Sequence, residues 1–288
     1  MKNLITVTGA TGTVGQHVVR ELRTRGQAVR AFVSDAAEAR RVLGPDVELA
    51  IGTFDDRAAL DAAFRGAAKA YVLVPLHPEQ VAWDAAAIDA AARAGVGHVV
   101  KHSVAGAQWA AIALGKWHRA GEQRLERAGV AWTHLRPSGF MTNALGWAPT
   151  IASQGAVYLP AGDGKLGVID PRDIGAAAAA VLTSSGHEGK AYDLTGPAAL
   201  STAEQVAILG EVLGRPLRYV DVPDDAARDA MLGLGMAPVI ADAMIGFMGL
   251  VRAGQAAAVS DGVQVLTGAA PRSFEAWARD HAAAFAAA

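Results

Sequence analysis

The first half of the chain alternates between short apolar runs and longer amphipathic segments. The apolar runs have strand length and predict β-strands at residues 4–8, 28–33, 47–51, 70–74, 98–103 and 132–136. The segments between them place apolar residues at helical spacing and predict helices at residues 14–25, 36–43, 57–64, 79–94 and 108–128. Strands that alternate with helices are typical of a parallel sheet covered on both faces. The pattern therefore predicts an α/β fold built on a doubly wound parallel sheet.

The second half follows a different rhythm. A stretch rich in glycine and proline precedes a predicted helix at 171–184, a short strand at 191–194, helices that begin near residues 201 and 223, and a last helix at 273–285. We therefore divide the chain into a first domain at 1–150 and a smaller substrate-binding lobe, mainly 151–288, with segments that return to the sheet.

A glycine-rich turn lies at the first junction between strand and helix, where residues 8–15 read TGATGTVG. In such a turn the first glycine permits a tight bend, the second lets backbone N–H groups approach a pyrophosphate, and the third allows close helix packing. The following helix N-terminus favours negative charge. The turn predicts a dinucleotide-binding Rossmann domain, and the alternative is that these glycines only shape a turn. The predicted phosphate-binding residues are Gly9, Thr11, Gly12, Thr13, Val14 and Gly15.

The end of the second predicted strand bears on the choice of cofactor. Asp35 follows Gly15 by 20 residues, which is the spacing of an acid that binds the adenosine ribose, and Ser34 precedes it. An acid here favours NAD(H), whereas a 2′-phosphate needs a guanidinium. Arg40 and Arg41 are the nearest candidates for that contact. The sequence leaves the preference open.

The ends of the later strands complete the predicted cofactor site. Thr53 and Phe54 follow the third strand and offer a polar and an aromatic group near the adenine. Asp55 or Asp56 beside them is equally consistent with a simple helix N-cap. The remaining residues assigned to the cofactor are Val74, Pro75, Ser103 and Pro137.

Composition excludes several other classes of function. The chain has no cysteine, so disulfides, thiolate metal sites and a cysteine nucleophile are excluded. Its net charge of −2 provides no positive field for nucleic acid or an anionic membrane. The scattered histidines form no metal-binding pattern, so we expect no metal site. The N-terminal apolar stretch is too short for a signal peptide, and we expect a cytoplasmic protein.

Several motifs resemble those of the NmrA-like atypical short-chain dehydrogenases/reductases, a group that includes triphenylmethane reductase-like and quinone oxidoreductase-like proteins. The turn at 8–15 is general to extended short-chain dehydrogenases, whereas LRPSGFMTN at 135–143 and DPRDI at 170–174 are more specific. Further motifs lie at residues 30–35, 52–55, 92–96, 192–197, 266–268 and 271–274. The resemblance covers the whole chain and implies a cofactor lobe that binds NADP(H) or NAD(H). Family members that prefer NADP(H) often carry arginine where this chain has Ser34, so either cofactor is possible.

A second departure concerns the catalytic acid. The usual tyrosine is followed four residues later by lysine, but none of the four tyrosines here has lysine at that position. The corresponding helix carries His118 and Glu122 on one face, and NmrA-like reductases often have a similar pair. His118 either orients substrate or donates a proton, or forms a surface ion pair with Glu122. Ser103 is the second catalytic candidate, and its alternative role is a strand-end cap.

The residues after the sixth strand predict an apolar substrate side. The candidates for substrate contact are Phe140, Met141, Asn143 and Trp147. Quinones, iminium ions and cationic dyes accept a hydride while solvent supplies any proton, so the missing tyrosine changes the substrate class without abolishing reduction. The sequence therefore predicts an NAD(P)H-dependent oxidoreductase acting on an apolar carbonyl, quinone or iminium-type acceptor.

Alternative functions and an alternative assembly remain at this point. The missing tyrosine is also consistent with a non-catalytic NAD(P)-binding redox sensor that acts through a protein partner. An isomerase or a dehydratase on the same fold is a further alternative, since fold does not fix function. The apolar stretch at 231–251 is interrupted by Asp242 and by glycines, which argues against a membrane span. It either covers the substrate site or forms a dimer interface, so the chain is a monomer or a homodimer.

Overall fold

A seven-stranded parallel sheet forms the centre of the computed structural model, which describes residues 3–286. Its strands are β1 (Leu4–Thr8), β2 (Ala28–Val33), β3 (Glu48–Ile51), β4 (Lys69–Val72), β5 (His98–His102), β6 (Ala131–Pro137) and β9 (Lys190–Leu194). Their order is β3-β2-β1-β4-β5-β6-β9, and every neighbouring pair is parallel. The order reverses beside β1, the position at which such sheets bind ligands. The predicted doubly wound fold is confirmed.

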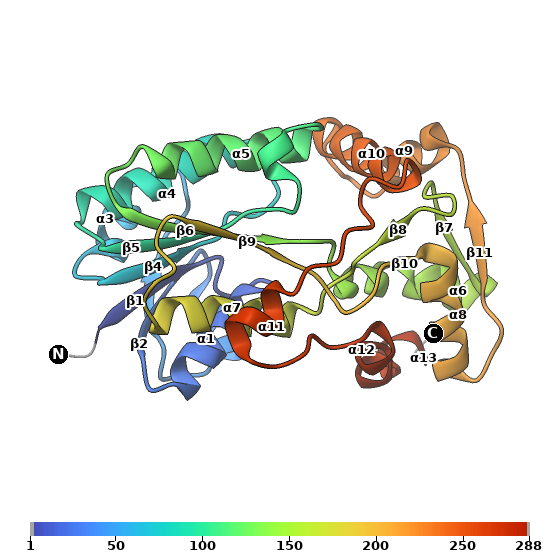
Figure 1. Cartoon of the computed structure of the whole chain (residues 1–288), viewed down its shortest axis with the longest axis horizontal. Coiled ribbons are helices and arrows are strands. Elements are labelled where there is room, and N and C mark those ends of the chain that lie inside the picture. Colours follow the sequence, from blue (N-terminus) through green and yellow to red (C-terminus); the bar gives the residue numbers. More distant parts are fainter. Residues whose placement is uncertain (1–2, 287–288) are drawn as a thin grey trace.

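Helices cover both faces of this sheet. They are α1 (Gly15–Thr24), α2 (Ala36–Leu43), α3 (Arg57–Phe64), α4 (Gln80–Arg93), α5 (Ala113–Glu126) and α7 (Pro171–Thr183). Figure 1 shows α3, α4 and α5 along one face and α1 and α7 along the other. Because successive strand residues point to opposite faces, Val100 and Leu135 belong to the core beside α1 and α7, whereas Val72 and Val99 belong to the core beside α3 and α4.

A glycine allows helices α1 and α7 to pack closely against each other. A Cβ atom on Gly175 of α7 would lie 2.6 Å from the Cβ of His17 on α1. Only glycine permits this distance, and it brings α7 against the helix that follows the glycine-rich turn. The close packing therefore fixes the position of the turn relative to the sheet.

Most of the remaining elements lie beyond the carboxyl edge of the sheet (Figure 1). They are α6 (Ala148–Gln154), β7 (Ala156–Leu159), β8 (Lys165–Leu166), β10 (Leu200–Ser201), α8 (Thr202–Leu213), β11 (Arg218–Asp221), α9 (Asp224–Gly233), α10 (Pro238–Arg252), α11 (Gly262–Thr267), α12 (Phe274–His281) and α13 (Ala283–Ala286). β7 pairs with β11 and β8 with β10 in two small sheets. Helix α10 packs against α9 and α5. No helix in the described range 3–286 is long and apolar enough to cross a membrane.

Two expected helices are interrupted in the structure. The helix predicted at 108–128 begins only at Ala113, because Gly106 and Ala110 adopt left-handed backbone conformations with φ of 82° and 49°. A short 3₁₀ turn at Ala107–Trp109 lies between them. The helix predicted at 273–285 is likewise two helices, α12 and α13, separated at Ala282.

Candidate active site

The glycine-rich turn occupies the carboxyl end of β1, and its three glycines have three different surroundings. Gly9 has a φ of +61°, and the N–H of Gly12 donates to the Gly9 carbonyl at 3.1 Å. A Cβ on Gly15 would lie 2.0 Å from the Gly9 carbonyl oxygen, so this glycine permits helix α1 to pack on the turn. A Cβ on Gly12 would meet only that oxygen, at 3.3 Å. Internal packing therefore explains Gly9 and Gly15, whereas Gly12 leaves space beside exposed backbone.

The start of α1 fits an anion at that space. Val14 precedes the helix without a side-chain cap, so no side chain satisfies the first N–H groups. Gly12 and Thr13 are exposed and Thr11 is half-buried. Free N–H groups at the positive end of a helix dipole suit a pyrophosphate. These residues fit the phosphates of a dinucleotide.

Asp35 at the end of β2 is a helix cap. Its carboxylate accepts hydrogen bonds from the backbone N–H groups of Ala37 at 2.7 Å and Glu38 at 3.1 Å at the start of α2. Ser34 beside it is exposed. Arg40 donates to the carbonyls of Pro45 and Val47, so its guanidinium holds the following loop.

Arg41, the other arginine considered for a 2′-phosphate, lies 3.8 Å from Glu38, and its side chain is 75% exposed. Within residues 3–286 its guanidinium makes no shorter ion pair. The choice between the two cofactors at this position stays a prediction.

A stack of three aromatic rings lies after β3 and β4. Phe54 stacks on Trp83 with ring centroids 5.6 Å apart, and Trp83 stacks on His77 at 4.0 Å. The Trp83 indole N–H donates to Asp55 at 2.7 Å, whereas Asp56 caps α3 by accepting from the N–H of Ala59. Asp56 thus has the capping role weighed from the sequence. Thr53 is exposed beside the stack.

Successive residues at the end of β5 point to opposite faces of the sheet. Lys101 and Ser103 point toward α4 and α5: Lys101 Nζ lies 2.7 Å from Asp84 Oδ1, and the Ser103 hydroxyl donates to Glu122 at 2.7 Å. The Lys101 and Asp84 side chains are at most 1% exposed. His102 points to the other face, beside α1 and α7. The predicted catalytic Ser103 therefore has a buried carboxylate as its partner.

Glu122 is the centre of an ionic network between α5 and β6. Both Glu122 oxygens accept from Arg136 at 2.8 Å, and Oε2 also accepts from Arg119 at 3.0 Å. Burial opposes ionisation of this carboxyl group, but the hydrogen bonds from Arg136 and Ser103 prevail and lower its pKa to about 2. Glu122 is therefore an anion at neutral pH with its hydrogen-bonding capacity in use.

His118 pairs with α4, and its partner is not Glu122. His118 Nε2 lies 3.2 Å from the side-chain amide nitrogen of Gln80, and Nδ1 is buried without a hydrogen-bond partner within residues 3–286. Burial, with the charge of Lys101, lowers the pKa of His118 well below its usual value. At neutral pH the ring is uncharged. It can accept or donate a hydrogen bond there but cannot act as a cationic acid.

The face opposite this network holds a buried tyrosine–histidine pair that sequence reasoning did not assign. The hydroxyl of Tyr71 on β4 lies 2.7 Å from Nδ1 of His102, and the His102 ring packs edge-on against Phe140 with centroids 6.0 Å apart. Burial lowers the pKa of His102 to about 3. Tyr71 pairs with Val100 in the sheet, so the strand register and the two-residue alternation together could have placed His102 beside it.

The other predicted residues lie around these strand ends. Phe140 is half-buried and Asn143 is exposed, whereas Met141 is 1% exposed and packs with Val168 in the C-terminal core. Trp147 packs against that same core. Among the residues assigned to the cofactor, Val74 is buried, Pro75 is exposed and Pro137 ends β6. Phe140 is the predicted substrate residue that contacts His102.

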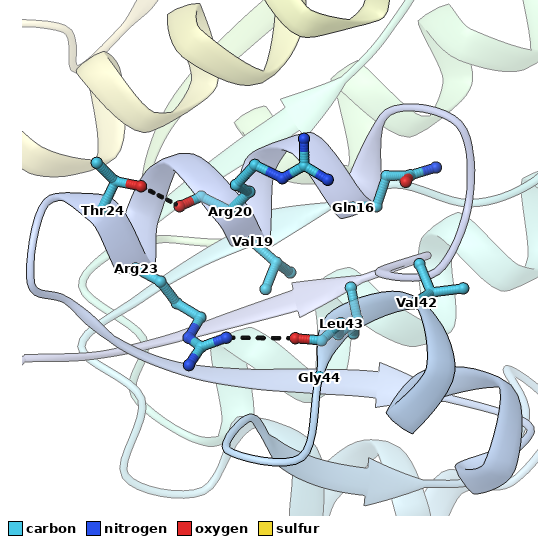
Figure 2. Close-up of a pocket in the computed structure, with 8 residues that line it drawn as sticks. All are labelled: Gln16, Val19, Arg20, Arg23, Thr24, Val42, Leu43 and Gly44. Atoms are coloured by element: carbon cyan, nitrogen blue, oxygen red, sulfur yellow. Dashed lines mark hydrogen bonds between the residues drawn. The ribbon is translucent and has the colours of Figure 1, made fainter.

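A cavity of about 520 Å³ lies elsewhere, between α1 and the end of α2. Figure 2 shows its lining side chains, where Arg23 donates to the Leu43 carbonyl and Thr24 to the Arg20 carbonyl. The cavity contains none of the residues predicted for substrate or catalysis. Because the predicted residues lie at the strand ends, we place the candidate site at the carboxyl edge of the sheet, from the turn after β1 to Phe140.

The sheet order and the open turn at Gly12 define a Rossmann protein of the dinucleotide-binding class. The model of the NmrA-like family matches residues 1–256, and the chain belongs to that family. It is 42% identical over 286 residues to the NAD(P)H azoreductase of Xenophilus azovorans, covering 99% of this chain and 100% of that protein. The family expected from the sequence motifs is confirmed.

Two solved structures have the same architecture over nearly their whole length. The NADPH-dependent quinone oxidoreductase of Escherichia coli complexed with NADPH has a TM-score of 0.87 and 26% identity, covering 96% of this chain and 99% of that chain. Triphenylmethane reductase of Citrobacter sp. complexed with NADP(H) has a TM-score of 0.85 and 26% identity, covering 96% and 99%.

Proposed function

We propose that this protein reduces a flat, apolar carbonyl, quinone or iminium-type acceptor by hydride transfer, without a tyrosine general acid. It is an NAD(P)H-dependent oxidoreductase of the NmrA-like family, and two of its structural neighbours are complexed with NADPH or NADP(H). Azo compounds belong in the tested set because a relative is an azoreductase.

Gly12 is the observation that carries the cofactor-binding part of the proposal. Its missing side chain leaves space beside the exposed residues Gly12 and Thr13 before α1, where a pyrophosphate fits. From there the cofactor would extend along the strand ends, with the residues after β2 and β3 at the adenosine and those after β5 and β6 at the nicotinamide. The bound cofactor supplies a hydride, which carries two electrons.

The residues around Phe140 support the apolar acceptor. Phe140 contributes an aromatic ring beside His102 at the carboxyl edge, and Met141 supports the following segment from the core. The ionic groups Glu122 and Lys101 already have charged partners on the other face. A quinone becomes a hydroquinone once a hydride is added and solvent protonates its oxygen, and an iminium ion becomes an amine on hydride addition alone. An active site without a cationic acid suits such acceptors.

His118 and Ser103 keep assigned roles within this proposal. His118, uncharged at neutral pH, would hold α5 against α4 through Gln80 at the edge of the site. Ser103 would hold the end of β5 through Glu122, close to the cofactor. Neither role requires proton transfer by these side chains.

The test is a measurement of NADPH oxidation with a panel of quinones, cationic triarylmethane dyes, azo dyes and small polar ketones. We expect turnover with the flat apolar compounds, and loss of turnover in a Gly12→Asp variant that keeps the thermal stability of the wild type. Binding of NADPH without oxidation by any acceptor would contradict the proposal and favour a redox sensor. Turnover only with small polar ketones would contradict the acceptor class.

A further inference from the structure

In the Tyr71–His102 pair, only one placement of the hydrogens gives the buried phenol a hydrogen-bond acceptor. Tyr71 is fully buried, and within residues 3–286 its hydroxyl has His102 Nδ1 as its hydrogen-bond partner. If Nδ1 carried the hydrogen, the phenol O–H would be buried without an acceptor, at a cost of about 1–3 kcal/mol. The satisfied arrangement has Tyr71 donating to Nδ1. The hydrogen of the neutral imidazole then lies on Nε2.

The outward nitrogen of His102 is accessible. Nε2 makes no hydrogen bond to any residue in the described range, and it is not among the buried polar atoms that lack a partner. His102 is 8% exposed, at the last position of β5, with Phe140 against its ring. Its Nε2–H is therefore not fully enclosed and lies at the carboxyl edge, beside the residue predicted to contact substrate.

We propose that His102 is a catalytic residue that donates a hydrogen bond from Nε2 to the acceptor atom that becomes negative during reduction. Tyr71 is a positioning residue that fixes the tautomer of His102. This inference rests on the proposed function, because it needs an acceptor that receives a hydride at this edge. A neutral donor that is already held in position stabilises the developing negative charge and keeps its own proton.

The step balances without a proton from the protein. The C4–H bond of the reduced nicotinamide breaks, and its hydride forms a new bond to the acceptor. With a carbonyl or quinone acceptor, the π electrons move to its oxygen, which becomes negative and accepts the hydrogen bond from His102. Water then protonates that oxygen, and the imidazole keeps its hydrogen throughout. An iminium ion becomes a neutral amine on hydride addition and does not need this donor.

The first test reads the tautomer directly in the protein without cofactor. Nitrogen-15 NMR of the histidine rings should show a His102 signal with hydrogen on Nε2 and none on Nδ1, assigned by its loss in a His102→Gln variant. In Tyr71→Phe the fixed tautomer should give way to a mixture. A hydrogen on Nδ1 in the wild type would overturn the inference.

The second test compares turnover of a quinone acceptor in three histidine variants. His102→Leu removes the donor, and we expect kcat to fall about 100-fold with KM changed less than threefold, since loss of one such donor typically costs 10²–10³ in kcat. His102→Gln retains an N–H donor and should keep kcat within about tenfold of wild type. His98→Gln is the matched control, because His98 lies on the same strand and face and bonds Thr133 at 2.9 Å, four residues before His102. Its kcat should not change.

The outcomes separate this inference from the proposed function. A wild type that reduces no acceptor refutes the proposed function. A wild type that turns over while His102→Leu retains at least half of its kcat refutes the role of His102 alone. Equal losses in His102→Leu and His102→Gln, with unchanged melting temperatures, would also refute the donor role.

Discussion

Asp35 combines two roles at a single residue. Its carboxylate accepts two backbone N–H groups and so caps α2, and it also places a negative charge at the end of β2, where the adenosine ribose of a dinucleotide is expected. Capping needs only a side-chain oxygen, whereas selection against a 2′-phosphate needs the charge. Substitutions can separate the two roles.

Asp35→Asn keeps the cap and removes the charge, whereas Asp35→Ala removes both. We expect the Asn variant to keep the stability of the wild type and to bind NADPH about two- to fivefold more tightly relative to NADH, since exposed charge interactions contribute about 0.2–1 kcal/mol. The Ala variant should lose about 1 kcal/mol of unfolding free energy. Urea unfolding and fluorescence titration measure the two effects. An unchanged NADPH-to-NADH ratio in both variants would show that Asp35 does not face the ribose.

At the scale of the elements, the glycines of the turn between β1 and α1 have different surroundings. Gly15 lies where a Cβ would overlap the Gly9 carbonyl, whereas Gly12 has space for a methyl group with a small adjustment. The same substitution should therefore have different effects at the two positions. We therefore expect stability to depend on the third glycine and phosphate binding on the second.

Gly15→Ala should lower the unfolding free energy by about 1–3 kcal/mol, the usual cost of overpacking. Gly12→Ala should change stability by less than about 1 kcal/mol and weaken NADPH binding at least tenfold, because the methyl group would occupy the space needed by the pyrophosphate. Chemical denaturation and calorimetric titration check the pair. Normal NADPH affinity in Gly12→Ala would contradict the assigned phosphate site.

The elements also show what sequence patterns can and cannot predict. The central strands and the glycine turn were predictable because their signals are local: an apolar run, a following breaker and glycines at fixed spacing. The short strands β7, β8, β10 and β11 were not, because two to four residues carry no clear period. The start of α5 was misplaced because Ala110, a good helix former, adopts a left-handed conformation. Tyr71 and His102 are 31 residues apart, and only strand register brings them together.

At the scale of the whole molecule, buried histidines couple stability to pH. Burial lowers the pKa of His102 to about 3 and, opposed by nearby Glu122, that of His134 to about 4, and it also lowers the pKa of His118. Below pH 6.5 the unfolded chain binds protons that the folded protein does not, so the folded state is destabilised as pH falls. Asp84 and Asp173, whose pKa values burial raises, act in the opposite direction.

Lowering the pH from 7.5 to 5.5 should therefore reduce the unfolding free energy by about 1.4 kcal/mol for each such histidine. Urea unfolding at the two pH values measures the change. In a His134→Gln variant, this pH-dependent loss of unfolding free energy should be smaller by about 1.4 kcal/mol. Glu122, with its pKa of about 2, adds to the loss only below pH 4.5. Equal losses of unfolding free energy in the wild type and in His134→Gln would contradict the burial of a neutral His134.

Hydride transfer from NADPH to a flat, apolar acceptor is the reaction that the proposed function assigns to this protein. The most direct measurement follows deuterium from NADPH labelled at C4, one face at a time, into the product of a cationic triarylmethane dye. In such a dye the hydride binds carbon and does not exchange. We predict one deuterium per product from one labelled face only, with a slower rate for that isotopomer. A reduced product without deuterium from either face would contradict the claim.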